Sequence, residues 1–145
     1  MQARLLTLED YPQLYQLWQD VQGFERGLRS LDDSREGIAK FLDRNPNTCF
    51  VIEADGRIVG GILAGNDGRR GYIYHAIVHP DFQGQGLGKM LVDHACEALR
   101  AEGIHKAGML VFGNNDQGNA FWESQGWVTR PDLVYRNKTL NPENE

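Results

Sequence analysis

Apolar positions recur with two different periods along the chain, and the longer period marks the expected helices. Residues spaced by three and four positions predict helices over 11–21, 32–44, 86–102 and, less regularly, 114–126. Pro12 favours Asp10 as the N-cap of the first helix, because proline is tolerated only in the first helical turn. Asp32 or Asp33 is the expected cap of the second.

The shorter period marks the expected strands. Runs rich in β-branched and aromatic residues predict strands over 3–6, 48–54, 57–65, 72–80 and 106–112. Asp55-Gly56 is a strong hairpin signal between the second and third of these runs. The segments 127–130 and 134–140 are expected to form a closing strand pair around Pro131-Asp132. The order of elements predicts a mixed α/β (α+β) domain over residues 1–145.

Composition narrows the classes of protein without naming one. The 145 residues, 41% hydrophobic and 24% charged, suit one ordinary globular domain. A net charge of -5 argues against a nucleic-acid or anionic-membrane partner. No apolar run has the length of a membrane span and the N-terminus does not resemble a signal peptide, so a cytoplasmic location is expected. Cys49 and Cys96 lack metal or redox spacing, so we expect two reduced, buried thiols and no metal.

The stretch Gln83-Gly-Gln-Gly-Leu-Gly88 joins a strand that ends at Pro80 to the best helix of the chain. A helix start offers unpaired amide N–H groups and a partial positive charge, which together attract anions. Glycines let the backbone approach bound oxygens and adopt unusual torsions. The expected ligand is a phosphate or pyrophosphate.

The spacing of these glycines does not match the common nucleotide motifs. The dinucleotide fingerprint needs a third glycine where Lys89 stands, and a P-loop needs glycine at Gln83 and Ser or Thr at Met90. A nucleotide-binding protein of another family is therefore disfavoured. Tighter binding of ATP or NAD than of CoA would support that alternative.

The remaining pattern, Gln83-x-x-Gly86-x-Gly88, resembles the acetyl-CoA signature of the GNAT superfamily of N-acyltransferases. The later stretch "NNDQGNAFWESQGW" is similar to the second motif of that superfamily, with Asn115 at its Asn, Gly118 at its Ala, Trp122 at its Tyr and Gly126-Trp127 at its Gly-Phe. The order of elements also matches the GNAT fold along essentially the whole chain. The resemblance implies a central mixed sheet of six to seven strands with about four helices and an acyl-CoA slot between two diverging central strands.

The resemblance also implies a cofactor, acetyl-CoA, and the residues that would hold it. The main-chain amides of the glycine turn would cradle the pyrophosphate, namely those of Gln83, Gly84, Gln85, Gly86, Leu87 and Gly88. Lys89 would add positive charge, and main-chain groups of Ile77 and Val78 would pair with the pantetheine arm. Asn115, Phe121 and Trp122 would complete the cofactor site. For Asn115 a helix N-cap is an equally good interpretation, and for Trp122 a place in the core is the simpler one.

The chain departs from the family at both proton-transfer positions. Trp122 replaces the tyrosine that often acts as the acid, and an indole N–H does not donate a proton at neutral pH. Tyr72 and Tyr74 stand where the family often has Glu or His. Strand alternation predicts that both tyrosines face the cleft with Ala76 and Val78, and they are the catalytic candidates. The same alternation places His75 on the reverse face, where a structural hydrogen bond is the simpler expectation.

The acceptor is not named by the sequence. The resemblance implies that residues 22–36 and 130–137 form its wall, and the acids of the first segment would attract a cationic amine. That segment also holds Arg26, Arg29 and Arg35, so a mixed, solvated surface is the simpler interpretation. The sequence predicts an N-acetyltransferase for a primary amine, small or on a protein, and dimers are frequent in the family. The alternative is a non-catalytic acyl-CoA-binding or sensing module.

Overall fold

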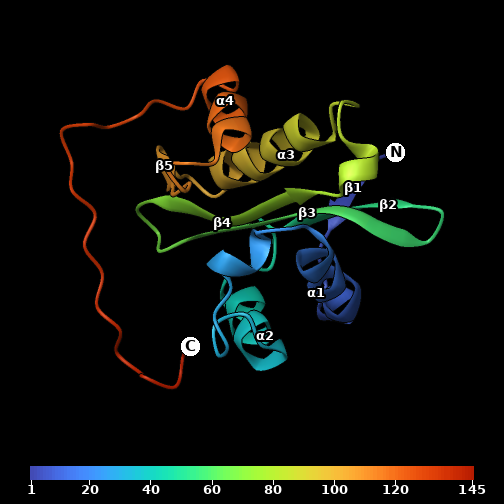
Figure 1. Cartoon of the computed structure of the whole chain (residues 1–145), viewed down its shortest axis with the longest axis horizontal. Coiled ribbons are helices and arrows are strands. Elements are labelled where there is room, and N and C mark those ends of the chain that lie inside the picture. The colour runs from blue at the N-terminus through green and yellow to red at the C-terminus, as the bar shows by residue number, and fades with distance from the viewer.

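The computed structural model describes all 145 residues and is built on a five-stranded mixed sheet (Figure 1). The strand order follows the chain, and the bounds are β1 (Ala3–Leu5), β2 (Phe50–Ala54), β3 (Arg57–Asn66), β4 (Gly71–Val78) and β5 (Ala107–Met109). The first four strands are antiparallel, whereas β5 runs parallel to β4. The hairpin at Asp55-Gly56 is confirmed, and both of its residues have positive φ.

Two helical layers cover the sheet (Figure 1). On one face lie α1 (Tyr11–Asp20) and α2 (Arg35–Arg44), and on the other lie α3 (Leu87–Ala101) and α4 (Asp116–Ser124). Short 3₁₀ turns are η1 (Leu8–Asp10), η2 (Phe24–Gly27) and η3 (Pro80–Phe82). The mixed α/β architecture with four helices is the one that the sequence predicts.

The helix starts were only partly predictable. α1 follows Asp10 and has Pro12 in its first turn, as expected. α2 is capped by Ser34, whose Oγ accepts a hydrogen bond of 3.0 Å from Gly37 N, so the prediction of Asp32 or Asp33 as the cap was wrong. Asp33 is unsuited to this role because its carboxylate is buried and bonded elsewhere in the structure.

The sheet separates two hydrophobic cores. The core beside α3 contains Ile62 and Ile73 from the sheet and Leu91 from the helix. The core beside α1 and α2 contains Trp18 and Ile77. Residues of β3 and β4 therefore contribute to both layers, which fixes these central strands firmly in place.

A β-bulge in the pairing of β3 with β4 changes which side chains of β4 share a face. The register shifts between Leu63 and Ala64, opposite Tyr74. Ile73 and Ile77, four residues apart, consequently pack in opposite cores, whereas an unbroken strand would place them on one face.

The predicted alternation of the tyrosines on β4 is therefore wrong. The Tyr74 ring lies 5.5 Å from that of Phe41 on α2, and the Tyr72 ring lies 4.7 Å from Tyr74. Both tyrosines lie on the side of α1 and α2, whereas Ala76 and Val78 pack against the α3 core.

The predicted closing strand pair does not form, so the sheet has five strands rather than six to seven. β5 pairs through only three residues and offers a short edge. Residues 128–145 carry no helix or strand and run as an extended segment whose end returns to the loop before α2 (Figure 1). There Asn144 Oδ1 accepts bonds of 3.0 Å from the amides of Leu31 and Asp32. The segment is therefore stretched between α4 and that loop instead of folding onto β5.

The two cysteines differ in exposure. Cys49 is buried, and burial raises the pKa of its thiol to about 12, whereas Cys96 is half-buried. No helix is both long and apolar enough to cross a membrane. No group of three or more His, Cys, Asp or Glu side chains is placed to hold a metal ion.

Candidate cofactor and acceptor site

The divergence of β4 from β5 creates a slot in the sheet. The two strands pair only through Gly71–Ile73 and Ala107–Met109, so the rest of β4 has no partner on that edge. The carbonyl of Val78 points to this edge, where it accepts a 3.3 Å bond from Gln83 Nε2. His79 N instead bonds Val59 O on β3 at 2.8 Å. By alternation, Ala76 and Val78 present main-chain groups to the slot. Ile77 presents its main-chain groups to β3, so the predicted pairing of these groups with a pantetheine arm is wrong for Ile77 and stays a prediction for Val78.

The glycine turn lies at one end of the slot with its amides open. Gly84 and Gly86 have φ of 79° and 78°, a left-handed conformation that glycine adopts without strain. The N–H groups of Gly84, Gln85 and Gly86 form no hydrogen bond with other main-chain groups. Gly86 is the N-cap of α3 and no side chain caps this helix, so its first amides are open as well. The turn has the properties of an anion site.

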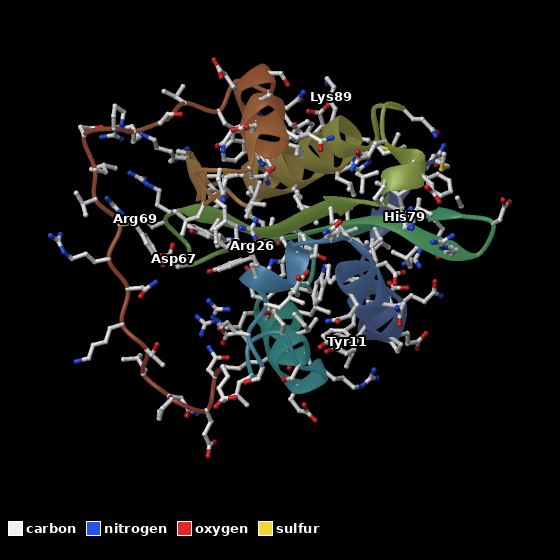
Figure 2. The ribbon with its side chains drawn as sticks, viewed as in Figure 1. Tyr11, Arg26, Asp67, Arg69, His79 and Lys89 are labelled. Atoms are coloured by element: carbon white, nitrogen blue, oxygen red, sulfur yellow. The ribbon has the colours of Figure 1, made fainter.

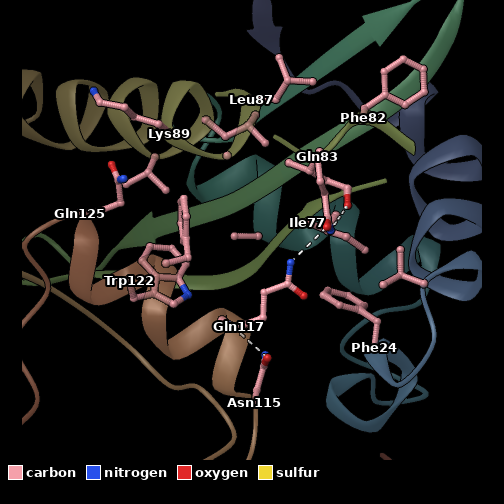
Figure 3. Close-up of a pocket in the computed structure, with 18 of the residues that line it drawn as sticks. Phe24, Ile77, Phe82, Gln83, Leu87, Lys89, Asn115, Gln117, Trp122 and Gln125 are labelled. Atoms are coloured by element: carbon pink, nitrogen blue, oxygen red, sulfur yellow. Dashed lines mark hydrogen bonds between the residues drawn. The ribbon is translucent and has the colours of Figure 1, made fainter. Parts of the chain in front are cut away.

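A single pocket of about 720 Å³ connects this turn with the slot (Figure 3). Most of the residues that the sequence predicts for the cofactor line it, namely Ile77, Val78, Gln83, Gly84, Gly86, Leu87, Gly88, Lys89, Asn115, Phe121 and Trp122. Gln85 does not line the pocket, and neither Tyr72 nor Tyr74 does. The structure thus brings the two sequence motifs together and leaves the catalytic candidates outside.

The helix α4 forms one wall of the pocket through its first turns (Figure 3). Asn115 is the N-cap of α4, and its Oδ1 accepts a 3.0 Å bond from Gly118 N. A Cβ at Gly88 would lie 3.2 Å from the Phe121 ring, so glycine allows α3 and α4 to approach closely. The Trp122 ring stands edge-on to both Phe121 and Trp127, with centroids 5.2 Å apart in each pair. Asn115 and Trp122 therefore combine a structural role with a place in the pocket.

Two glutamines join the glycine turn to α4. Gln117 Nε2 donates a hydrogen bond of 3.2 Å to Gln83 Oε1, while Gln83 Nε2 is bonded to Val78 O (Figure 3). The side-chain amide of Gln83 is thus hydrogen-bonded to the Val78 carbonyl, which faces the slot.

The charged groups of the pocket are all positive. Arg26 and Lys89 are its only charged lining residues, although the chain as a whole carries a net charge of -5. Lys89 Nζ is paired with Asp93 at 2.6 Å. No aspartate, glutamate, histidine or tyrosine lines the pocket. The pocket therefore holds no side chain of the kinds that commonly act as a general base.

The tyrosines of β4 are poor bases by their environment as well as by their position. Burial raises the pKa of Tyr72 to about 12, and the charge of Tyr135 adds to this effect. Burial, followed by the charge of Asp32, also raises the pKa of Tyr74 above its ordinary value. Both phenols remain neutral at physiological pH.

His75 takes the structural position that was expected for it. Its Nε2 lies 2.7 Å from Asp33 Oδ1, and its ring packs edge-on against Trp18 at 5.0 Å and Phe24 at 5.5 Å. The residue is enclosed on the side of α1 and does not line the pocket.

Sequence reasoning placed residues 22–36 in the acceptor wall but did not single out the residues of η2 that line the pocket, and it missed the segment after β5. Phe24, Arg26 and Phe112 line it there, as does Gln117 of α4. In the sequence, Arg26 belongs to a segment of mixed charges, and no pattern there indicates that Arg26 rather than Arg29 would face the pocket. The only available signal was the family's use of this loop as an acceptor wall.

A family model described as "Acetyltransferase (GNAT) family" matches residues 11–127 of the chain. A protein of Pectobacterium atrosepticum named as an acetyltransferase is 30% identical over 145 residues, which cover 100% of this chain and 99% of that protein.

Solved structures show the same fold. The PaiA N-acetyltransferase of Thermoplasma acidophilum, solved in complex with coenzyme A, matches with a TM-score of 0.73 and 18% identity over 86% of this chain and 87% of that one. An aminoglycoside acetyltransferase from an uncultured soil metagenomic sample, solved with sisomicin, matches with a TM-score of 0.74 and 23% identity over 97% and 96% of the two chains.

Proposed function

We propose that this chain, which belongs to the GNAT acetyltransferase family and uses acetyl-CoA, transfers the acetyl group to a primary amine by direct attack in a ternary complex. The observation that carries this proposal is the continuous pocket from the open amides of the glycine turn to the unpaired edge of β4. One end suits a pyrophosphate, and the slot suits an extended amide-containing arm.

The cofactor is placed by main-chain groups. The open amides of residues 84–88 bind the pyrophosphate at the start of α3, whereas the main-chain amide of Gln83 already donates to Pro80 O, and Lys89 adds charge beside the site. The pantetheine arm pairs with the slot-facing groups of Val78 and Ala76, as an added strand would. The Gln83 amide must leave the Val78 carbonyl for this pairing to form. Asn115, Phe121 and Trp122 of α4 enclose the arm from the other side.

The reaction needs few side chains. The neutral amine attacks the thioester carbon, an N–C bond forms, the C–S bond breaks, and the CoA thiolate takes a proton. A slot-facing N–H of β4 near Val78 stabilises the oxyanion. Since no aspartate, glutamate, histidine or tyrosine lines the pocket to accept it, the proton of the acceptor ammonium passes to solvent. Holding both substrates side by side supplies much of the acceleration.

The test is a thiol-release assay with acetyl-CoA against amines of several classes, including amino acids, amino-acid amides, a diamine and peptide N-termini. We expect release above the rate of hydrolysis for at least one class, with N-acetylated product identified by mass spectrometry. Binding of acetyl-CoA without release from any class would contradict the transfer and support the acyl-CoA-binding module.

A further inference from the structure

The acceptor end of the pocket carries a cation without a charged partner. Arg26 Nε donates a hydrogen bond of 3.2 Å to Gly23 O, and no hydrogen bond or ion pair engages its two terminal nitrogens. The guanidinium carbon lies 4.3 Å from the centre of the Phe112 ring. A guanidinium stacked in this way is held flat and presents two parallel N–H donors, which suits a carboxylate.

Arg26 is separate from the phosphate site. Figure 2 shows Arg26 on η2, on the side of the sheet that carries α1, and Lys89 on α3, on the opposite side. The open amides of the glycine turn, together with Lys89, would bind the cofactor phosphates on the α3 side of the sheet. An anion that binds Arg26 therefore comes from the second substrate.

The acids near this end do not compensate the charge of Arg26. No acid lines the pocket. Asp33 is bonded to His75 and, at 2.7 Å, to the amide of Arg29. Asp32 Oδ2 accepts a 2.9 Å bond from Asn144 Nδ2. Glu25, the neighbour of Arg26 on η2, is exposed, forms no ion pair with Arg26 and does not line the pocket. The two aspartates are thus engaged in holding the loop, and the only charge that lines the acceptor end of the pocket is positive.

We propose that Arg26, stacked on Phe112, binds a carboxylate of the acceptor, so that the acceptor is a small amine that also carries a carboxylate. This inference rests on the proposed acetyl transfer and names its substrate class. It disfavours a polyamine, which Arg26 repels, and a peptide N-terminus, whose first residue has an amide in place of the carboxylate.

The experiment measures thiol release from acetyl-CoA with α-, β- and γ-amino acids, each paired with its primary amide, and with 1,4-diaminobutane. We expect kcat/KM for at least one amino acid to exceed that for its amide by tenfold or more. Release from the amides or the diamine alone would overturn this inference and leave the transfer standing. Release from no amine of any class would overturn the transfer as well.

Substitutions at Arg26 test whether this residue causes the preference for an amino acid over its amide. Arg26→Gln is expected to raise KM for the preferred amino acid at least tenfold, with kcat, the amide kinetics and the acetyl-CoA Kd nearly unchanged, and Arg26→Lys to recover part of the loss. Arg44→Gln, an exposed arginine of α2 outside the pocket, is the matched control and should change none of these. An unchanged KM in Arg26→Gln would overturn the assignment.

Discussion

His75 on β4 and Asp33 in the loop before α2 are joined by a contact of 2.7 Å between Nε2 and Oδ1. The side chains are largely enclosed, with 12% and 8% of their surfaces exposed. The same loop is tied to α1, because Tyr11 Oη donates a hydrogen bond of 2.7 Å to Asp33 O. This small network holds the acceptor side of the pocket against the central strand.

Asp33→Ala should loosen this side of the pocket. It leaves the His75 nitrogen and the Arg29 amide without their partner, and an unsatisfied buried polar group costs about 1–3 kcal/mol. We expect the free energy of unfolding, measured in urea, to fall by about that amount. KM for the acceptor should rise while the acetyl-CoA Kd stays constant. A stability equal to that of the wild type would show that the contact is not formed in solution.

Trp122→Tyr should leave kcat unchanged or raise it. The indole N–H does not supply a proton to the departing thiolate, whereas a tyrosine hydroxyl at this position of the pocket wall would. The smaller ring loses contact with Phe121 and Trp127, so a loss of stability of about 1 kcal/mol is expected. Steady-state kinetics checks the first point and thermal unfolding the second. A drop of more than tenfold in kcat with intact CoA affinity would give the tryptophan a role of its own.

Tyr72→Phe and Tyr74→Phe test the original catalytic candidates. Both rings lie outside the pocket and both phenol pKa values are raised, that of Tyr72 to about 12, so neither supplies a base near neutral pH. We expect kcat to change less than about threefold. The rate should rise with pH toward the pKa of the acceptor amine itself in the wild type and both variants. Loss of that pH dependence in either variant would restore the tyrosine as the proton acceptor.

Arg4→Met should destabilise the protein at neutral pH and much less in acid. Arg4 bonds both carboxylate oxygens of Asp10 at 2.8 Å, and this pairing is the main cause of the lowered pKa of Asp10. A depressed carboxyl pKa contributes stability above the unfolded-state value of 3.8, and this contribution disappears as pH falls through the folded-state value. We expect a loss of about 1 kcal/mol at pH 7, because 43% of the Arg4 side chain is exposed and solvent screens the pair. A loss of equal size at pH 2 would contradict an ionic origin.

The fold was predictable wherever a local signal decides the structure. The helical period of residues 86–102, the hairpin at Asp55-Gly56 and the glycine turn each fix an element without distant contacts, and all three are found. The open amides at the start of α3 were predictable for the same reason.

Features that depend on distant pairing were not predictable. The bulge opposite Tyr74 arises from the register of β4 on β3, while the sequence of β4 shows an unbroken alternation. Residues 134–140 have the composition of a strand, but the last residues bond to Ser30 and Asp32, and β5 is too short to pair with them. Which arginine of η2 and its following loop faces the pocket is likewise decided by tertiary packing against Phe112.

The most direct test of the central claim is a calorimetric titration of acetyl-CoA into the wild type, Gly86→Glu and Gly56→Glu. Both glycines have positive φ, 78° and 76°, and neither would clash with a new Cβ, so the two variants carry the same backbone cost of about 1–2 kcal/mol and the same added charge. Only Gly86 lies in the pocket. We predict tight binding by the wild type and Gly56→Glu and none by Gly86→Glu, with all three proteins unfolding cooperatively. Equal binding by Gly86→Glu, or no binding by the wild type, would contradict the assignment of the glycine turn to acetyl-CoA.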